Sequence, residues 1–237
     1  AVAEAARNIA CTGAIPLAVT DNLNFGNPHK PENFLQLREA IEGLAEACRA
    51  FDTPVTGGNV SLYNESPAGA IDPTPTVGMV GLVEKPEHIT TQAFKAAGDI
   101  ILLIGEPGNE LGASHYLLAV HGRKAGAPPH LDYAKELAVQ NAVRDLIRKG
   151  LVKSAHDCSE GGLAVNLAES CLSGNLGAKT EIPGTRADVA LFNESQSRIV
   201  ITVSPENAAK AEDFLKSRKV PHSRLGTVTA DPFLSIQ

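Results

Sequence analysis

Two adjacent glycines, Gly57 and Gly58, follow a short apolar run and begin a segment with side-chain oxygens at alternate positions. If this segment is extended, Asn59, Ser61 and residues 63 and 65 share one face of a strand. Glycine lets backbone N–H groups approach a bound anion because it has no Cβ. Oxygen ligands beside such an anion suit Mg²⁺ that bridges nucleotide phosphates. The alternative is a hairpin or strand entry in which the glycines only provide positive φ.

A polar stretch with one carboxylate, residues 20–28, follows the strand predicted over residues 14–19. Its Gly, Pro and Asn residues favour a loop, with Asp21 at the end of the strand. Charged groups just beyond the carboxyl end of a strand are a common position for a binding site in α/β folds. The alternative interpretation is an Asx-rich turn without a binding role.

Apolar residues that recur at three- and four-residue steps predict two long amphipathic helices, over residues 31–50 and 132–149. Short aliphatic runs predict strands over residues 76–83, 100–104 and 199–203. Trp is absent and aromatic residues make up only 4% of the chain, so the core must consist mainly of aliphatic side chains. This balance indicates an α/β fold.

A loop at residues 155–162 ends in a second glycine pair and leads into a predicted helix. Free N–H groups and the helix dipole favour an anion at a helix start, so one interpretation is a phosphate seat. The other is a capped helix start with Ser159 as the N-cap. The run at residues 156–158 does not suit a base–nucleophile pair, because neighbouring residues on a strand point to opposite faces.

Charge and cysteine usage exclude several classes of protein. The net charge is −6, and residues 1–90 hold 5 Lys/Arg and 11 Asp/Glu. No basic stripe is present, so we expect no nucleic-acid partner. Four widely spaced cysteines without a C-x-x-C motif predict reduced thiols in a cytoplasmic protein. We predict neither a membrane span nor a signal peptide. The chain begins without Met and within a helical pattern, so we expect the natural chain to be longer.

Five motifs in order along the chain resemble those of one known family. They are D-N-L-N-F-G-N-P at residues 21–28, T-G-G-N-V-S-L-Y-N-E at 56–65, P-T-P-T-V-G-M-V-G at 73–81, D-C-S-E-G-G-L-A at 157–164 and L-F-N-E-S-Q-S-R at 191–198. The set resembles the ATP-dependent synthetase subunit of phosphoribosylformylglycinamidine synthase (FGAM synthetase), a purine-pathway enzyme. Each motif alone is weak, but the five at these spacings are highly specific, and the resemblance covers nearly the whole chain.

The resemblance implies an α/β fold of the AIR-synthetase type. The family consists of two pseudo-equivalent halves, each with an N-terminal domain that contributes strands to a shared barrel, followed by an α/β domain. This chain resembles only the second half. The turn at residues 85–88 then divides an AIR-synthetase N-terminal-like domain, residues 1–88 and truncated at its start, from a C-terminal-like domain, residues 89–237.

The resemblance also implies the chemistry of a C–N ligase that uses glutamine as amido donor. ATP phosphorylates the amide oxygen of formylglycinamide ribonucleotide, and ammonia from a separate glutaminase then displaces phosphate to give formylglycinamidine ribonucleotide. By motif position, Asp21 and Gly58 are expected to bind ATP, Asn59 to ligate Mg²⁺ and Ser61 to contact the ribonucleotide. The family's catalytic His lies in the absent first half, so catalytic residues of this chain remain unknown.

The partners implied by the resemblance are a glutaminase subunit, a small accessory subunit, and either the missing first half or a second copy of this chain. Missing barrel strands predict an exposed apolar edge that would favour such association. We expect the chain alone to be inactive as a synthetase. One alternative is a non-catalytic scaffold half that carries a structural nucleotide and docks the catalytic half and the glutaminase. Another is a related enzyme of the superfamily, such as AIR synthetase or selenophosphate synthetase.

Overall fold

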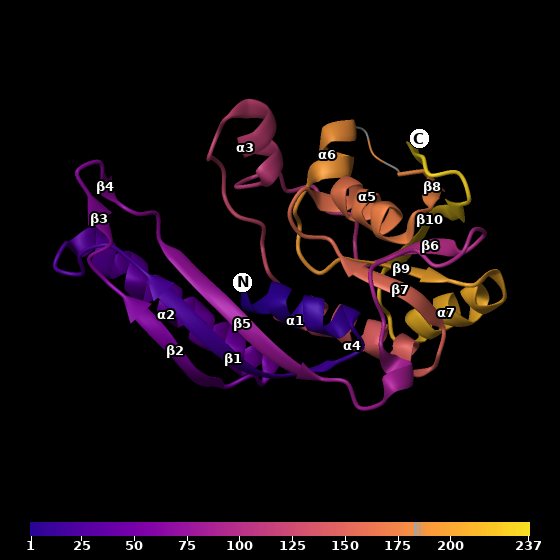
Figure 1. The fold of residues 1–237 in the computed structure, drawn as a ribbon, viewed down its shortest axis with the longest axis horizontal. Helices are drawn as coiled ribbons and strands as arrows, with labels where there is room; N and C mark the ends of the chain where they lie inside the picture. The colour runs from indigo at the N-terminus through magenta and orange to yellow at the C-terminus, as the bar shows by residue number, and fades with distance from the viewer. Residues whose placement is uncertain (183, 185) are drawn as a thin grey trace. The chain divides into compact units, whose positions relative to one another are not determined.

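The computed structural model describes residues 1–182, 184 and 186–237, which form two compact units (Figure 1). The first unit comprises residues 1–9 and 15–82, and the second comprises residues 10–14 and 83–237. The helices are α1 (Val2–Cys11), α2 (Pro31–Phe51), η1 (Pro86–His88), α3 (His115–His121), α4 (Tyr133–Arg148), α5 (Gly162–Gly174), α6 (Ala187–Phe192) and α7 (Pro205–Ser217). The strands are β1 (Ile15–Asn24), β2 (Val55–Ser61), β3 (Glu65–Ser66), β4 (Gly69–Ala70), β5 (Thr74–Leu82), β6 (Ile100–Ile104), β7 (Val152–Asp157), β8 (Gly177–Thr180), β9 (Ile199–Val203), β10 (His222–Thr229) and β11 (Leu234–Ile236).

The first unit contains a three-stranded sheet in the order β2-β1-β5, and α2 lies along it (Figure 1). The middle strand β1 is parallel to β2 and antiparallel to β5. Val19 and Leu23 of β1 are buried, whereas Val80 and Leu82 of β5 are 62% and 52% exposed. One face of the sheet is therefore covered by protein, and the other presents polar and apolar side chains to solvent.

The predicted loop at residues 20–28 and the glycine-pair segment both lie at least partly in strands of the structure. The first continues β1 to Asn24, so the predicted end of the strand at residue 19 is wrong. The glycine pair lies inside β2, and neither glycine has a positive φ, so the hairpin interpretation is also wrong. Pairing between the two strands explains the result, because ladder hydrogen bonds, together with the burial of Val19 and Leu23 in β1, outweigh the turn preference of Asn and Gly.

The long helix α2 confirms the prediction for residues 31–50. It begins with Pro31 in its first turn and ends before Asp52, whose left-handed conformation (φ 53°) closes the last turn. Its apolar face is only partly covered, because Ala47, Cys48 and Phe51 are buried while Phe34 remains 53% exposed. The first half of α2 thus adds apolar surface to this unit.

The second unit is a six-stranded sheet in the order β11-β8-β10-β6-β9-β7, with helices on both faces (Figure 1). Strand β6 is fully aliphatic because alternate side chains enter different cores. Leu102 and Ile104 pack with α4 and α7, whereas Ile101 and Leu103 pack with α5. The strands predicted at residues 100–104 and 199–203 and the helix predicted at 132–149 are confirmed in this unit.

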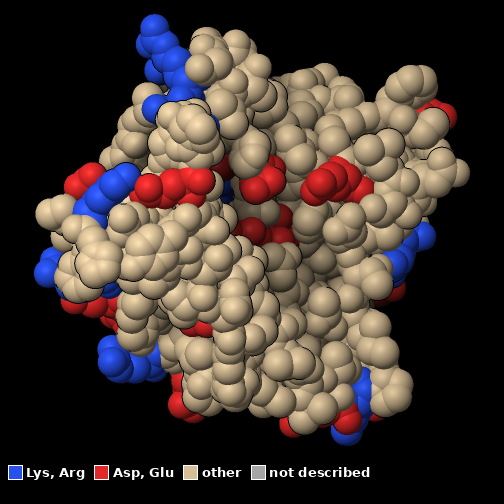
Figure 2. Space-filling view, turned by 60° about the vertical axis from the view of Figure 1, so that its left-hand side comes forward, with Lys and Arg blue, Asp and Glu red and all other residues tan. Residues whose placement is uncertain are grey.

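The described residues show how the basic side chains and the cysteines are distributed. Lys and Arg lie at separate points on the face drawn in Figure 2, which therefore presents no continuous basic surface. All four cysteines are buried and none forms a disulfide. Within the described chain, every helix is too short or too polar to cross a bilayer.

Candidate functional site

Asp21 and Gly58 lie directly opposite each other on β1 and β2. A Cβ on Gly58 would stand 1.9 Å from Oδ1 of Asp21 and 2.6 Å from its backbone oxygen. Only glycine leaves room for this carboxylate between the strands. Burial raises the pKa of the Cys48 thiol, and the charge of Asp21 raises it further, as expected if the carboxylate lies on the side of the sheet that α2 covers.

Asn59 and Ser61 project from the opposite face of the same sheet. Asn59 pairs in register with Asn22, and its Nδ2 donates to Oδ1 of Asn22 at 3.2 Å. Ser61 Oγ donates to Oδ1 of Asn64 at 3.2 Å. Successive side chains of a strand alternate between faces, so the one-residue step from Gly58 to Asn59 separates the two groups. The structure brings the four predicted residues onto neighbouring strands, but the Asp21 carboxylate does not converge with the side chains of Asn59 and Ser61.

The edge position of β2 leaves its backbone open. Residues 55–60 are exposed, and no atom lies within 4 Å of the position that a Cβ on Gly57 would take. An edge strand also has a row of N–H and C=O groups that no neighbouring strand pairs. The strand can therefore offer backbone donors to an anion as well as the side-chain oxygens of Asn59 and Ser61.

Residues 63 and 65 do not continue the predicted oxygen-bearing face. Strand β2 ends at Ser61, and Tyr63 has a left-handed backbone (φ 59°) that turns the chain. Asn64 Nδ2 closes this turn by donating to the backbone oxygens of Phe25 and Ser61. The expectation that positions 59, 61, 63 and 65 share one face is wrong beyond Ser61, because the extended conformation stops there.

The Glu65 carboxylate is bound within the first unit. It accepts hydrogen bonds from the Asn27 N–H and the Lys30 ammonium, both at 3.0 Å, and from the Asn33 amide at 3.4 Å. The hydrogen bond from Asn27, followed by that from Lys30, lowers the pKa of Glu65 below its ordinary value of 4.5. Glu65 therefore fastens the segment before α2 to the turn after β2.

Replacing Glu65 with Gln is expected to lower the melting temperature at pH 7, because a neutral Gln accepts a weaker hydrogen bond from the Lys30 ammonium than a carboxylate does. A depressed folded-state pKa means that the wild-type advantage is fully present above the unfolded pKa near 4.5 and is lost as pH falls through the lower folded pKa. Thermal unfolding of both proteins from pH 7 to acid pH measures this. Glu42→Gln, at an exposed carboxylate on α2, controls for the loss of one charge. A difference that persists unchanged in acid would contradict the role assigned to the Glu65 carboxylate.

The oxygen donors on the exposed sheet face fit a divalent cation only in part. Asn59 and Ser61 supply neutral oxygens, and no three His, Cys, Asp or Glu side chains of the described residues are grouped to hold a metal ion. Mg²⁺ in proteins takes few protein ligands when phosphates and water complete its octahedron. The residues present therefore suit an ion that arrives with, and is balanced by, nucleotide phosphates.

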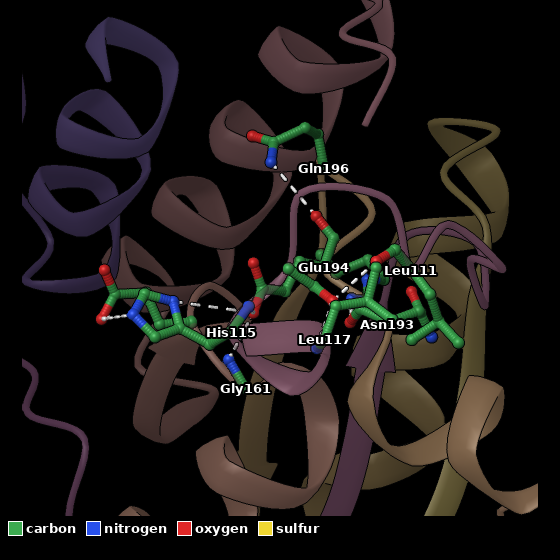
Figure 3. Close-up of polar contacts among 10 residues, drawn as sticks. Leu111, His115, Leu117, Gly161, Asn193, Glu194 and Gln196 are labelled. Atoms are coloured by element: carbon green, nitrogen blue, oxygen red, sulfur yellow. Dashed lines mark hydrogen bonds and ion pairs between the residues drawn. The ribbon is translucent and has the colours of Figure 1, made fainter. Parts of the chain in front are cut away.

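The second glycine pair begins α5 in a different way from the predicted Ser159 cap. Gly161 is the N-cap, with φ 76°, and Ser159 does not cap the helix, so that prediction is wrong. Instead, Oε1 of Glu194 accepts the N–H of Gly161 at 2.9 Å and the N–H of His115 at 2.8 Å (Figure 3). A carboxylate is favourable at a helix start for the same reason as a phosphate. A phosphate at the same N–H groups would have to displace Glu194.

The motif at residues 191–198 packs against the start of α5. Arg198 is 1% exposed and donates to the backbone oxygens of Ser195 and Asn193 at 2.9 and 2.7 Å. A Cβ on Gly162 would lie 2.4 Å from the Asn193 oxygen, so the two loops are in close contact. The side chain of Cys158 is buried in the apolar core, which removes it as a nucleophile.

Two residues of these sites were not predicted from the sequence. Asn22 was assigned to a loop, although the alternation of buried Val19 and Leu23 with polar Thr20 and Asn22 is a period-two strand signal. Glu194 lies within the motif at residues 191–198, which by itself assigns it no contact. Its contact with Gly161 joins distant parts of the chain, and no local pattern encodes it.

Domain-family comparison matches both parts of the chain. Residues 1–83 match the AIR synthase related protein N-terminal domain, and residues 96–237 match the AIR synthase related protein C-terminal domain. The chain belongs to the AIR synthase related protein family. The predicted fold class, with AIR-synthetase-like N-terminal and C-terminal domains, is thereby confirmed.

Individual relatives are similar to nearly the whole of this chain. It is 52% identical over 229 residues to "Phosphoribosylformylglycinamidine synthase subunit PurL" of Alkaliphilus metalliredigens, covering 96% of this chain and 31% of the relative. A protein of the same name from Moorella thermoacetica is 53% identical over 227 residues, covering 95% and 31%. The predicted resemblance is confirmed, and the chain spans about a third of the length of these relatives.

Solved structures support the same fold. Thermotoga maritima PurL complexed with ATP has a TM-score of 0.75 at 20% identity, covering 100% of this chain and 37% of that chain. The same protein complexed with FGAR has a TM-score of 0.75 at 21% identity, covering 100% and 39%. At this identity the likeness concerns the fold alone.

Proposed function

We propose that this chain supplies part of the ATP, Mg²⁺ and substrate site of phosphoribosylformylglycinamidine synthase. The enzyme would convert formylglycinamide ribonucleotide, glutamine-derived ammonia and ATP to formylglycinamidine ribonucleotide, ADP and phosphate in purine biosynthesis. The observation that carries the proposal is the 52% identity across 96% of the chain to a relative of that name. The solved relatives complexed with ATP and with FGAR add support.

In this proposal the chain positions groups and contributes little covalent chemistry, as is usual in phosphoryl transfer. The open backbone of β2 at Gly58, with Asp21 across the ladder, takes part in binding the nucleotide. Asn59 offers an oxygen to Mg²⁺, which when bound would neutralise phosphate charge, and Ser61 offers a hydroxyl to the ribonucleotide. Since the Asp21 carboxylate faces the other side of the sheet, we propose that Asp21 acts there or through its backbone.

The wider assignments follow from the same proposal. We propose a domain division at residues 1–88 and 89–237 and a cytoplasmic location. We also propose partnership with a glutaminase, a small accessory subunit and the missing first half or a second copy. The exposed Val80 and Leu82 on the uncovered sheet face favour such association. We also propose that the chain alone does not catalyse the synthetase reaction.

Replacing Asn59 with Ala in the enzyme that contains both halves is expected to reduce kcat at least about tenfold, because one oxygen for the ion is lost. Steady-state rates at varied Mg²⁺ measure the effect. Thr76→Val, on the same sheet face but on β5, is the matched control and should retain normal rates. Unchanged turnover in Asn59→Ala would remove the proposed role of this residue.

The alternative function is a scaffold half that carries a structural nucleotide and docks the catalytic half and the glutaminase. The apolar side chains on the uncovered face of the first sheet favour it. Under this alternative, Asn59→Ala would leave kcat intact while weakening retention of a tightly held nucleotide. Nucleotide content of the purified variant, measured beside its turnover, separates the two functions.

A further inference from the structure

Asn22 and Asn59 form a side-chain pair on the uncovered face of the first sheet. They are register partners on parallel strands, and both are exposed. Nδ2 of Asn59 donates to Oδ1 of Asn22 at 3.2 Å. We propose that Asn22 is a positioning residue that turns the amide of Asn59 so that its oxygen is available to a divalent cation. This inference rests on the proposed function of Asn59.

The two ends of an Asn amide differ completely toward a cation. The oxygen is a ligand, whereas the NH₂ group is a donor that repels the ion. The terminal torsion of Asn is broad and roughly two-fold, so an unrestrained amide presents either end. A hydrogen-bond acceptor beside the NH₂ group selects one orientation. Oδ1 of Asn22 is that acceptor, and it leaves the oxygen of Asn59 directed away from Asn22.

The backbone under Asn22 is fixed from both sides. Asn22 pairs with Asn59 of β2 and with Thr76 of β5, so it lies in the middle of the ladder. Asn24 Nδ2 also donates to the backbone oxygen of Thr74, which ties β1 to β5 at the same end. The acceptor therefore has a fixed base, whereas Asn59 lies on the edge strand. A side chain on the central strand β1 thus holds a side chain on the edge strand β2, which is how a metal ligand is preorganised.

Variants at position 22 separate orientation from simple packing. Asn22→Leu keeps the size of the side chain but removes the acceptor. Asn22→Asp keeps an acceptor at the same place. Asn59→Asp presents an oxygen in either orientation, so its ion binding should not depend on residue 22. Thr76→Val, beside Asn22 on β5, is the matched control for a changed side chain on this face.

The test uses the full-length enzyme with both halves and Mn²⁺ as the probe, with free Mn²⁺ followed by electron paramagnetic resonance in the presence of a non-hydrolysable ATP analogue. Asn22→Leu is expected to raise the Kd for Mn²⁺ about tenfold, the usual scale for loss of a group that orients a metal ligand. Its kcat should recover at high Mg²⁺, because the oxygen remains present. Asn22→Asp should bind Mn²⁺ at least as tightly as wild type, because it keeps the acceptor and adds a negative charge. Thr76→Val should stay near wild type, and Asn22→Leu should have no further effect in the Asn59→Asp background.

The outcomes distinguish this inference from the function on which it rests. If Asn59→Ala leaves Mn²⁺ binding and turnover unchanged, the assignment of Asn59 itself fails. If Asn59→Ala weakens Mn²⁺ binding but Asn22→Leu matches wild type, only the positioning role is overturned. If Asn22→Leu weakens binding equally in the Asn59→Asp background, Asn22 is a direct ligand and the positioning role is again overturned.

Discussion

Gly58→Ala is expected to lower kcat/KM for ATP about 100-fold in the enzyme with both halves, the scale of an ångström-sized misplacement in a reaction site. The new Cβ would lie 1.9 Å from the Asp21 carboxylate oxygen and 2.6 Å from the Asp21 backbone oxygen. The carboxylate can rotate away, but the backbone oxygen belongs to the ladder. Strands β1 and β2 must therefore separate, and the Asn59 and Ser61 side chains move with β2.

Gly57→Ala is the matched control for this experiment. A Cβ at position 57 would meet no atom within 4 Å, and neither glycine has a positive φ. The two variants thus share the same loss of backbone freedom and differ only in the contact with Asp21. Steady-state kinetics with ATP as the varied substrate, together with circular dichroism to monitor folding, measures the contrast. Equal kinetics for the two variants would contradict the importance of the close approach at Gly58.

Arg198→Met is expected to lower the free energy of unfolding of the second unit by about 3 kcal/mol. The guanidinium is buried and donates to the carbonyl oxygens of Ser195 and Asn193, which are themselves buried. Methionine fills a similar volume but has no donor, so both oxygens lose this partner away from water. The loop that carries Glu194 should loosen together with them.

Urea unfolding followed by circular dichroism measures the effect of Arg198→Met. Arg218→Met is the control, because Arg218 is exposed and pairs with Asp145 at the surface at 3.2 Å. Its loss should cost less than about 1 kcal/mol. A similar small loss for Arg198→Met would mean that its buried hydrogen bonds add little to the stability of this unit.

Elements whose signals are local are predictable from the sequence. Helix α2 begins at Pro31 as predicted and ends at Phe51, one residue beyond the prediction, because proline and the apolar repeat act within a few turns. Helix α4 starts after Asp132, whose side chain caps it. The buried strands β6 and β9 were equally clear, since each is a continuous aliphatic run.

Elements that depend on contacts between distant residues are the ones that the sequence predicts least well. The Asn and Gly residues of β1 and β2 favour turns locally, and only their mutual pairing makes them strands. The opposite orientation of Asp21 and Asn59 depends on that register, which a single sequence does not contain. The start of α5 is similar, because the N–H of its N-cap Gly161 binds the distant Glu194, and the neighbouring Ser159 does not cap the helix.

The carboxylate of Glu194 has a consequence for two helix starts of the second unit. One oxygen receives N–H groups from the beginnings of two helices, α3 and α5. The negative charge of Glu194 therefore balances the partial positive charge at the starts of both helices in the folded chain. These N–H groups therefore have their hydrogen-bond partner without a bound phosphate compound.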